Sequence, residues 1–430
     1  VNGNSLRCKV VGEGGNLGLT QLGRVEASRH GVRLNTDAID NSAGVDTSDH
    51  EVNIKILLDG AVRDGELSEA DRDALLVAMT DEVASLVLAD NYDQNVLLGN
   101  ARWGAAALIS VHARMIADLE ARGILNRALE YLPDDEEITT RAAAHQGLTS
   151  PELAILAAYA KIALTGDLDG TGLSADPWFA AYAVDYFPAL LRERFAARIA
   201  THPLRDEIIT TVVVNNLIND GGISVVYRAC EETGASPLEV VRAATAATAI
   251  FDLPSFWSAV NSLDNQVPTS AQDALHHESR RLLDRSIRWF LQTRGGALDV
   301  SAEVARFAPA VQELAPLVPD ALVGIERTRL DASTAAFVAA GAPQALAEQA
   351  SAMLDVFALL DIVQIADSVG QSPAEIMPLY FALSERYDVD RLLSRITALA
   401  RGDRWTALAR QALRTDLYAA LAGVTAGVAT

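Results

Sequence analysis

The stretch VVGEGGNLGLTQLGRVE, residues 10–26, has the pattern of a short apolar strand, a glycine-rich turn and the start of a helix. Gly12, Gly14 and Gly18 fit a loose G-x-G-x-x-x-G spacing, and Asp37 follows near the place where a dinucleotide fold has its ribose-binding acid. Such a fingerprint needs a parallel sheet behind it, because neighbouring strands bury both faces of the first strand. Whether this turn binds a dinucleotide therefore depends on how many strands surround it.

Only two strands are predicted. Residues 8–12 and 32–39 have the composition of strands, and residues 20–30 between them that of a helix. From about Ser68 onward the apolar residues recur with helical spacing, and no third strand follows. The sequence therefore predicts a mainly α protein, in which a short α/β N-terminal segment carries the last strands of a Rossmann-like nucleotide domain and precedes an all-helical region.

A motif repeats within the helical region. The sequence GASPLEV at 234–240 recurs as GQSPAEI at 370–376, and FDL at 251–253 recurs at the same offset as YDV at 387–389. In both copies serine would cap a helix, proline would lie in its first turn, and the triplet would end it about four turns later. Two related helical modules are the interpretation that we favour, and chance reuse of a common capping signal is the alternative.

Two further features suggest a boundary before these modules. The acidic run at 134–137 indicates a loop or a helix start, and TSPE at 149–152 is a helix start with proline in the first turn. The predicted division is 1–60 for the distal part of the dinucleotide-binding (catalytic) domain, 61–147 for a helical connecting region, 148–295 for one helical module and 296–430 for the second.

Composition excludes several classes of partner. The 430 residues include 35 basic and 57 acidic side chains, a formal charge of −22, so no attraction to nucleic acid is expected. The apolar runs are too short to span a bilayer, and we expect no membrane partner. Cys8 and Cys230 are too few for a disulfide framework, which favours the cytoplasm. Because the chain starts at Val1, we expect a fragment of a longer polypeptide.

The N-terminal motifs resemble a known family. EGGNLGLTQ at 13–21 and NTDAIDNSAGVDTSDHEVN at 35–53 resemble the distal half of the nucleotide-binding domain of glutamate dehydrogenases, where an E-G-A-N turn precedes an N-A-G-G-V-x-x-S loop. The form at 41–58 is similar to the large, single-polypeptide NAD-dependent branch found in bacteria. Its helical C-terminal region is similar to later stretches of this chain, at 153–164, 187–211 and 263–291.

The resemblance implies roles for four residues. Asn16 matches the asparagine near the substrate amino group, and Ser48 the serine that helps to hold the side-chain carboxylate of glutamate. Asn41 matches the one that contacts the nicotinamide half of NAD. Gly44 alone must allow close approach of the cofactor, because Ser42-Ala43-Gly44 stands where the family has alanine-glycine-glycine. Two amides and a hydroxyl suit the orientation of a polar substrate.

The resemblance also places the glycine turn outside the phosphate site. The turn at 12–18 would belong to a later strand, and the true fingerprint is expected before Val1. In this family a lysine and an aspartate of the substrate domain handle proton transfer. None of the three lysines, Lys9, Lys55 and Lys161, lies in the glycine-rich context of that lysine, so we expect no catalytic residue here.

The complete protein is therefore expected to catalyse NAD-dependent oxidative deamination of L-glutamate to 2-oxoglutarate and ammonia. This chain would be its C-terminal portion, contributing part of the cofactor and substrate site and a helical assembly or regulatory region, and would be inactive by itself. Its partners would be the upstream polypeptide and further copies in a homo-oligomer. The alternatives are a helical scaffold or interaction protein with a degenerate nucleotide-domain remnant, and an independent nucleotide-binding regulator that uses the glycine turn.

Other polar residues invite functional readings that we do not favour. Adjacent histidines on a helix point about 100° apart, so His276-His277-Glu278 is not expected to bind metal, and no metal site is predicted. His50 could touch substrate, but a solvent-facing or capping role is favoured. Asp46, Asp49 and Glu51 could form a carboxylate cluster, or could favour the start of a helix expected near Asp46.

A group of aromatic residues has helical spacing and is expected in the core, with an interface to other domains or subunits as the alternative. It comprises Trp178, Phe179, Tyr182, Tyr186 and Phe187.

Overall fold

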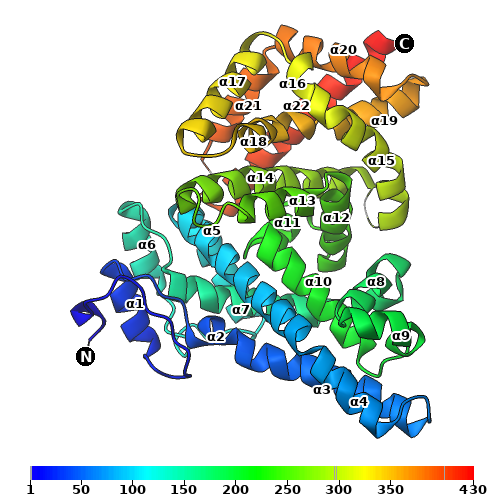
Figure 1. The fold of residues 1–430 in the computed structure, drawn as a ribbon. Helices are drawn as coiled ribbons and strands as arrows, with labels where there is room; N and C mark the ends of the chain where they lie inside the picture. Colours follow the sequence, from blue (N-terminus) through cyan, green and yellow to red (C-terminus); the bar gives the residue numbers. More distant parts are fainter. Residues whose placement is uncertain (1, 295, 297, 401) are drawn as a thin grey trace. The chain divides into compact units, whose positions relative to one another are not determined.

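The computed structural model describes residues 2–294, 296, 298–400 and 402–430. It is 77% helical and contains no strand or sheet within these residues (Figure 1). The predicted α/β N-terminal segment with Rossmann-like strands is therefore wrong, whereas the helical region is as predicted.

The two predicted strands touch at one place only. Val10 and Arg33 form an isolated parallel bridge, in which Val11 N–H donates to Arg33 O at 2.9 Å and Arg33 N–H donates to Lys9 O at 2.8 Å. A strand pair needs further strands or a packed face to be stable, and no other described segment joins this one. The second predicted strand ends early, because residues from Asp37 form a helix.

The chain forms two compact units, residues 1–225 and 226–430. The elements of the first are η1 (Gly3–Ser5), α1 (Gln21–Arg29), α2 (Asp37–Asp40), α3 (Ser42–Arg63), α4 (Glu69–Ala78), α5 (Thr80–Ala121), α6 (Asp135–Ala143), α7 (Ser150–Leu168), η2 (Leu173–Ala175), α8 (Pro177–Asp185), α9 (Ala189–Ile199) and α10 (Arg205–Gly221). The elements of the second are α11 (Val225–Thr233), which begins at the boundary, α12 (Pro237–Ile250), α13 (Leu253–Asn261), α14 (Thr269–Arg294), α15 (Val300–Leu314), η4 (Ala315–Leu317), α16 (Val318–Ala321), α17 (Gly324–Ala339), α18 (Gln344–Val356), α19 (Leu359–Val369), α20 (Pro373–Arg386), α21 (Val389–Ala398) and α22 (Arg404–Ala429).

The first unit is organised by α5, a helix of 42 residues that is about 63 Å long at 1.5 Å per residue. It packs against α3, α6, α7 and α10 (Figure 1). Leu97, Leu98 and Ile116 of α5 and Leu153 and Leu156 of α7 are buried almost completely. This apolar packing fixes α3, whose first residues carry the candidate site.

Helix starts in the first unit follow local capping. The side chain of Thr20 caps α1, and that of Ser68 caps α4. Thr149 forms a capping box with Glu152 at the start of α7, which confirms the TSPE start. The helix expected near Asp46 begins earlier, at Ser42.

The predicted aromatic group belongs to the core only in part. Phe179 and Phe187 are fully buried, whereas Trp178, Tyr182 and Tyr186 are partly buried. Tyr186 and Phe187 pack edge to face with ring centroids 5.3 Å apart.

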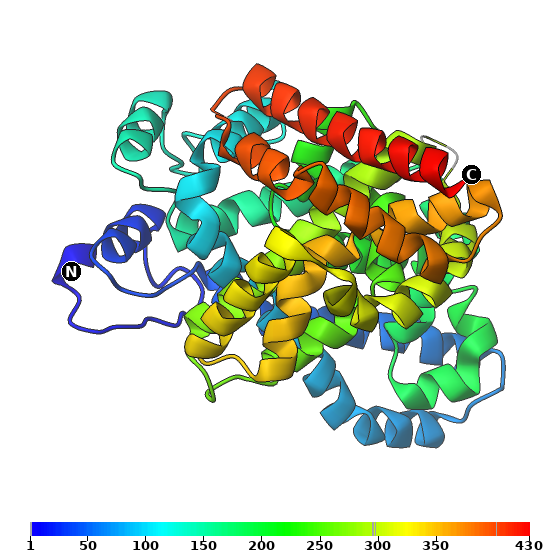
Figure 2. The same ribbon diagram turned by 90° about the horizontal axis from the view of Figure 1, so that it is seen from above.

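The second unit has an aromatic core between α14 and α15. Trp289, Phe290 and Phe307 pack edge to face, with ring centroids 5.0, 5.6 and 6.0 Å apart. Figure 2 shows α22, in red, lying along the orange helices α20 and α21, which it contacts. The unit therefore has its own apolar core.

The repeated motif has the same local structure in both copies. Ser236 and Ser372 form capping boxes with Glu239 and Glu375, at the starts of α12 and α20. Each helix has 14 residues and ends at the aromatic residue of the triplet. The helix starts and ends predicted from the repeat are confirmed.

The aspartate of each triplet has a left-handed backbone. Its φ angle is 46° at Asp252 and 56° at Asp388, and the next helix begins directly after it. A left-handed residue reverses the chain in one step, and aspartate tolerates this conformation better than most residues. The boundaries of the modules, at 148–295 and 296–430, stay a prediction.

No single helix in the described parts of the chain is both long and apolar enough to cross a membrane. Helices α10 and α11, a sharply bent pair, reach that length and composition only when taken together.

Candidate functional site

The four predicted site residues lie together at the start of α3. Asn41 occupies the N-cap position of this helix, and its side chain, instead of capping, donates from Nδ2 to Oδ1 of Asn16 at 3.2 Å. Asn16 is exposed and Asn41 is partly buried. The structure therefore brings the glycine turn at 12–18 against the N-terminus of α3.

Gly44 and Ser48 lie one turn apart on α3. A Cβ atom at Gly44 would stand 3.2 Å from Oδ1 of Asn41, so a side chain there would press on the amide. The Ser48 hydroxyl donates to the carbonyl oxygen of Gly44 at 3.4 Å, a long bond, and the residue is exposed. Its hydroxyl can therefore turn to a ligand at little cost.

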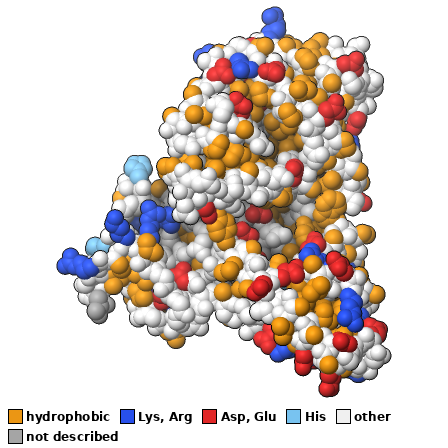
Figure 3. Space-filling view, in the orientation of Figure 1, with side chains coloured by type: hydrophobic (Ala, Val, Ile, Leu, Met, Phe, Trp, Pro, Cys, Tyr) orange, Lys and Arg blue, Asp and Glu red, His pale blue; other side chains and the backbone are white. Residues whose placement is uncertain are grey.

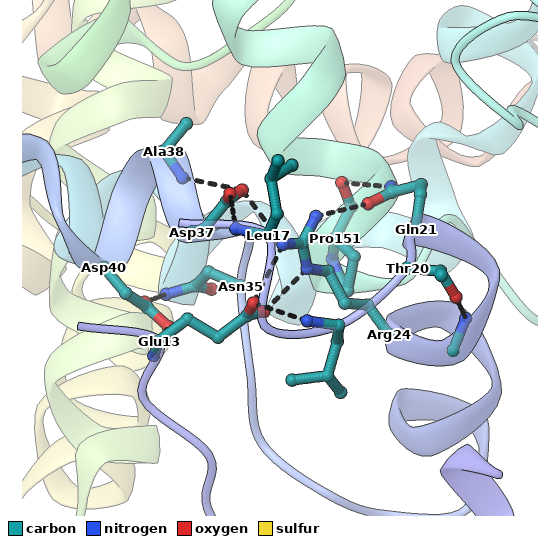
Figure 4. A network of polar contacts seen from close by, with 12 residues as sticks. Glu13, Leu17, Thr20, Gln21, Arg24, Asn35, Asp37, Ala38, Asp40 and Pro151 are labelled. Carbon is teal, nitrogen blue, oxygen red and sulfur yellow. Dashed lines mark hydrogen bonds and ion pairs between the residues drawn. The ribbon is translucent and has the colours of Figure 1, made fainter. Parts of the chain in front are cut away.

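A buried ion pair holds the glycine turn in place (Figure 4). Arg24 of α1 donates from Nε to Glu13 Oε1 at 2.6 Å and from Nη2 to Glu13 Oε2 at 2.9 Å. The same Nη2 lies 2.9 Å from Oδ1 of Asp37. The side chains of Arg24 and Glu13 are only 7% and 3% exposed. One guanidinium therefore ties α1, the turn and α2 together.

Backbone groups of the turn complete this network. Leu17 N–H donates to Asp37 at 2.8 Å, Leu19 N–H to Glu13 at 3.1 Å, and Glu13 N–H to Asp40 at 3.0 Å (Figure 4). The bond from Leu17, with the charge of Arg24, lowers the pKa of Asp37. Because carboxylates accept from the N–H groups of Glu13 and Leu17 and bring negative charge to the turn, it is poorly suited to a pyrophosphate.

Residues of α5 brace the other side of the site. Asn91 donates from Nδ2 to the carbonyl oxygen of Ile39 and to the hydroxyl of Ser42, both at 2.8 Å. Asn35 donates to Oδ1 of Asn95 at 2.9 Å. The link between α2 and α3, which includes Asn41, is thereby fixed to the longest helix of the unit.

Behind the site, three residues gather between α3 and α5. A ligand atom from each of Asp46, His50 and Asp90 lies within 4.8 Å of the other two, and we call them the Asp46–His50–Asp90 cluster. Among the described residues this is the one group of His, Cys, Asp and Glu side chains close enough to share a metal ion. Burial, with the carboxylate of Asp90, raises the pKa of Asp46 to about 7.

Two preferences from the sequence are corrected here. His50 is only 2% exposed and stacks on Tyr186, with ring centroids 4.4 Å apart, so it neither faces solvent nor caps a helix. The first turn of α3 contains no acidic residue. Asp46 lies one turn further along and turns towards Asp90, so its role is not to favour the helix start.

Lys161 of α7 lies near the same carboxylates. Burial lowers its pKa to about 8, although the charges of Asp90 and Asp93 act in the opposite direction. It is the one lysine on a largely buried helix, and its charge offsets part of the negative charge around the cluster.

His276 stays outside any such group. Its Nε2 lies 2.9 Å from Oδ1 of Asn261, and burial lowers its pKa to about 3. A buried histidine with an amide partner needs no metal to explain it.

Sequence reasoning did not single out Glu13, Arg24 or Asn91, although Glu13 stands at the head of the quoted EGGN motif. Their partners are set by the packing of α1, α2 and α5, which no local spacing reveals. The available signal was that Asn91 and Asn95 stand four positions apart, which places both on one face of the helix.

Basic side chains gather over the N-terminal elements on the face shown in Figure 3. The exposed basic residues of this segment are Arg7, Lys9, Arg29 and Arg33. In a chain with a net charge of −22, this local excess is the part best suited to anionic ligands.

Comparison with known proteins covers both parts of the chain. Residues 1–101 match the family described as "Bacterial NAD-glutamate dehydrogenase, catalytic domain", and residues 145–430 match "Glutamate dehydrogenase, C-terminal". The chain is 46% identical over 98% of its length to an NAD-specific glutamate dehydrogenase of Mycobacterium tuberculosis, and 44% identical over 97% to one of Pseudomonas aeruginosa. It spans about a quarter of these relatives, 26% of each.

Proposed function

Since the chain belongs to the family of bacterial NAD-specific glutamate dehydrogenases, we propose that it forms the C-terminal portion of an enzyme that deaminates L-glutamate oxidatively, giving 2-oxoglutarate and ammonia. The observation that supports this most is the contact between Asn16 and Asn41, which lie 25 residues apart in the sequence. Both of the family's motifs meet there in one exposed site.

The residues present fit NAD as the cofactor. When bound, NAD accepts the hydride from the substrate. Asn41 donates from Nδ2 to Asn16, and its side-chain oxygen Oδ1 remains as an acceptor for the amide group of a nicotinamide. The missing side chain at Gly44 keeps the space beside that oxygen clear. In this proposal Asn41 and Gly44 bind the cofactor.

Asn16 and Ser48 would orient the substrate. Asn16 Oδ1 accepts one hydrogen bond from Asn41 and keeps a second lone pair. Because Asn16 is exposed, this oxygen would accept a hydrogen bond from the substrate amino group. The Ser48 hydroxyl would exchange its long bond to Gly44 for a charge-assisted bond to the side-chain carboxylate of glutamate. The proton transfers are assigned to residues outside this chain.

The test is Ser48→Ala in the full-length dehydrogenase that contains this sequence. A hydrogen bond to an ionised acceptor is worth about 1.5–3 kcal/mol, so kcat/KM for glutamate should fall roughly 10- to 150-fold. Thr47→Ala is the matched control, because Thr47 is exposed on the same turn and donates to Ala43 O at 2.7 Å. The control should change kcat/KM by less than about twofold.

Asn41→Ala should show the opposite bias, with its larger defect in KM for NAD. The 430-residue chain by itself is expected to give no glutamate-dependent NAD reduction. If Ser48→Ala stays within a factor of two of the wild type, Ser48 does not bind the substrate. If Asn41→Ala is equally silent, the site is a remnant and the chain acts as a helical scaffold.

Homo-oligomerisation and a cytoplasmic location stay predictions.

A further inference from the structure

The buried imidazole of His50 lacks the hydrogen bonds that such a group normally makes. Its Nδ1 has no partner within the part of the chain that the structure describes, and its Nε2 lies 3.9 Å from Asp46 Oδ1, beyond hydrogen-bonding range. The stacking on Tyr186 satisfies neither nitrogen. Buried polar groups are nearly always paired, so the unpartnered Nδ1 of an imidazole whose other nitrogen lies near a carboxylate indicates a missing partner.

Asp46 is incomplete in the same way. Its Oδ2 is buried without a hydrogen-bond partner, although the residue stands beside a second carboxylate, that of Asp90. Two carboxylates in contact repel each other unless a cation or a proton lies between them. The surroundings add further negative charge, because the carboxylate of Asp49 acts on Asp46 and that of Asp93 lies near Asp90. Lys161 offsets part of this charge through Asp90 and Asp93.

From this geometry we propose that the Asp46–His50–Asp90 cluster is a binding site for one divalent transition-metal ion. One imidazole nitrogen and two carboxylate oxygens are a ligand set that suits Zn²⁺ or Mn²⁺, with water completing the coordination. Metal–ligand bonds of about 2.1 Å keep ligand atoms about 3.0–3.5 Å apart. The ligand atoms of the cluster lie within 4.8 Å of one another, so each pair would have to approach by at most about 1.8 Å to bind an ion. Rotation of the side chains can supply this movement.

The ion would connect the site to the longest helix. Asp46 and His50 belong to α3, which begins beside Asn41, and Asp90 precedes Asn91 on α5, which already braces that link. A bound ion would hold the two helices together directly behind the exposed residues. The role that follows is structural and does not depend on the proposed dehydrogenase activity.

The experiment titrates the metal-free 430-residue chain with Mn²⁺ alone and with Zn²⁺ alone, followed by calorimetry. One ion of each should bind per chain with micromolar or tighter affinity, and spin-echo spectra of bound Mn²⁺ should show one imidazole nitrogen. His50→Ala and Asp90→Asn should each weaken binding by at least about 100-fold. Asp49→Asn, which removes a nearby charge but no ligand, should weaken it by less than about tenfold.

Two controls separate metal loss from misfolding and from unrelated binding. Asp90→Asn relieves the repulsion with Asp46, so its melting temperature without metal should be equal to or above that of the wild type. His276→Ala removes another buried histidine and should leave affinity unchanged. The proposal is overturned if the wild type binds neither ion, since a proton shared by Asp46 and Asp90 then explains the cluster, or if His50→Ala and Asp90→Asn bind as tightly as the wild type.

Discussion

Replacing Arg24 by methionine should loosen the glycine turn selectively. The change keeps most of the apolar stem but leaves the carboxylate of Glu13, 3% exposed, without its counter-charge. Removing one partner of a buried ion pair typically costs about 3–5 kcal/mol, most of which is the penalty for the charge that remains. Asp37 loses the same partner but is more exposed, at 16%, so it adds little.

The amide protons of the turn report this loss directly. Leu17 N–H donates to Asp37 and Leu19 N–H donates to Glu13, so both should exchange with solvent faster when the network opens. A cost of about 3 kcal/mol corresponds to a rate increase of at least about 100-fold. Hydrogen–deuterium exchange of the peptide that covers residues 13–24, followed by NMR or mass spectrometry, gives the measurement.

Arg29 supplies the matched control on the same helix. Its ion pair with Glu137 is 2.9 Å long but 49% and 38% exposed, and such pairs are worth at most about 1 kcal/mol. Arg29→Met should therefore change exchange in the turn by less than about fivefold. Adding Glu13→Gln to Arg24→Met should restore part of the protection. Equal effects of Arg24→Met and Arg29→Met would refute the reasoning.

Two further predictions concern the second unit. Asp361 accepts hydrogen bonds from Trp289 and Tyr380, and burial raises its pKa from 3.8 to about 6. Between these two pH values the folded state keeps a proton that the unfolded state loses, so stability falls as the pH rises from about 4 to about 6. Asp361→Asn should raise the free energy of unfolding at pH 8 by up to about 3 kcal/mol, measured as a higher melting temperature, and should leave both unchanged at pH 4. An equal gain at both pH values would contradict this. Ser236→Ala and Ser372→Ala should each cost about 1 kcal/mol in denaturant titrations, and a cost at only one of them would show that the two caps are not equivalent.

Helix positions were predictable from the sequence because their signals are local. The capping boxes at Ser236 and Ser372 are set by residues three positions apart, and the structure has them as expected. The shared triplet predicted where each helix ends, but not the left-handed backbone of its aspartate. The resemblance also identified the family, because the motifs around Asn16 and Asn41 are specific in both residue type and spacing.

The two strands failed because strand formation is not local. Val10 and Arg33 do pair, but a sheet requires neighbours that the spacing within residues 8–39 cannot supply. Asp37, which was considered as a ribose ligand, instead accepts from Leu17 and Arg24 and ends the extended segment. The burial of His50 could not be predicted either, because it depends on stacking against Tyr186, which is distant in the sequence.

The use of arginine in the buried ion pairs limits how the protein could be modified after synthesis. Arg24, Arg141 and Arg288 each engage carboxylates with their guanidinium groups while almost fully buried, and a guanidinium neither loses its proton at any physiological pH nor accepts an acetyl group as an amine does. These ion pairs are therefore not broken by deprotonation or by acetylation of the arginine. Lys161, with a pKa of about 8, is the opposite case, because a small neutral fraction of its amine is present at pH 7. An acylating reagent would thus find in Lys161 an unusually nucleophilic amine, limited only by its partial burial beside the carboxylates of α5.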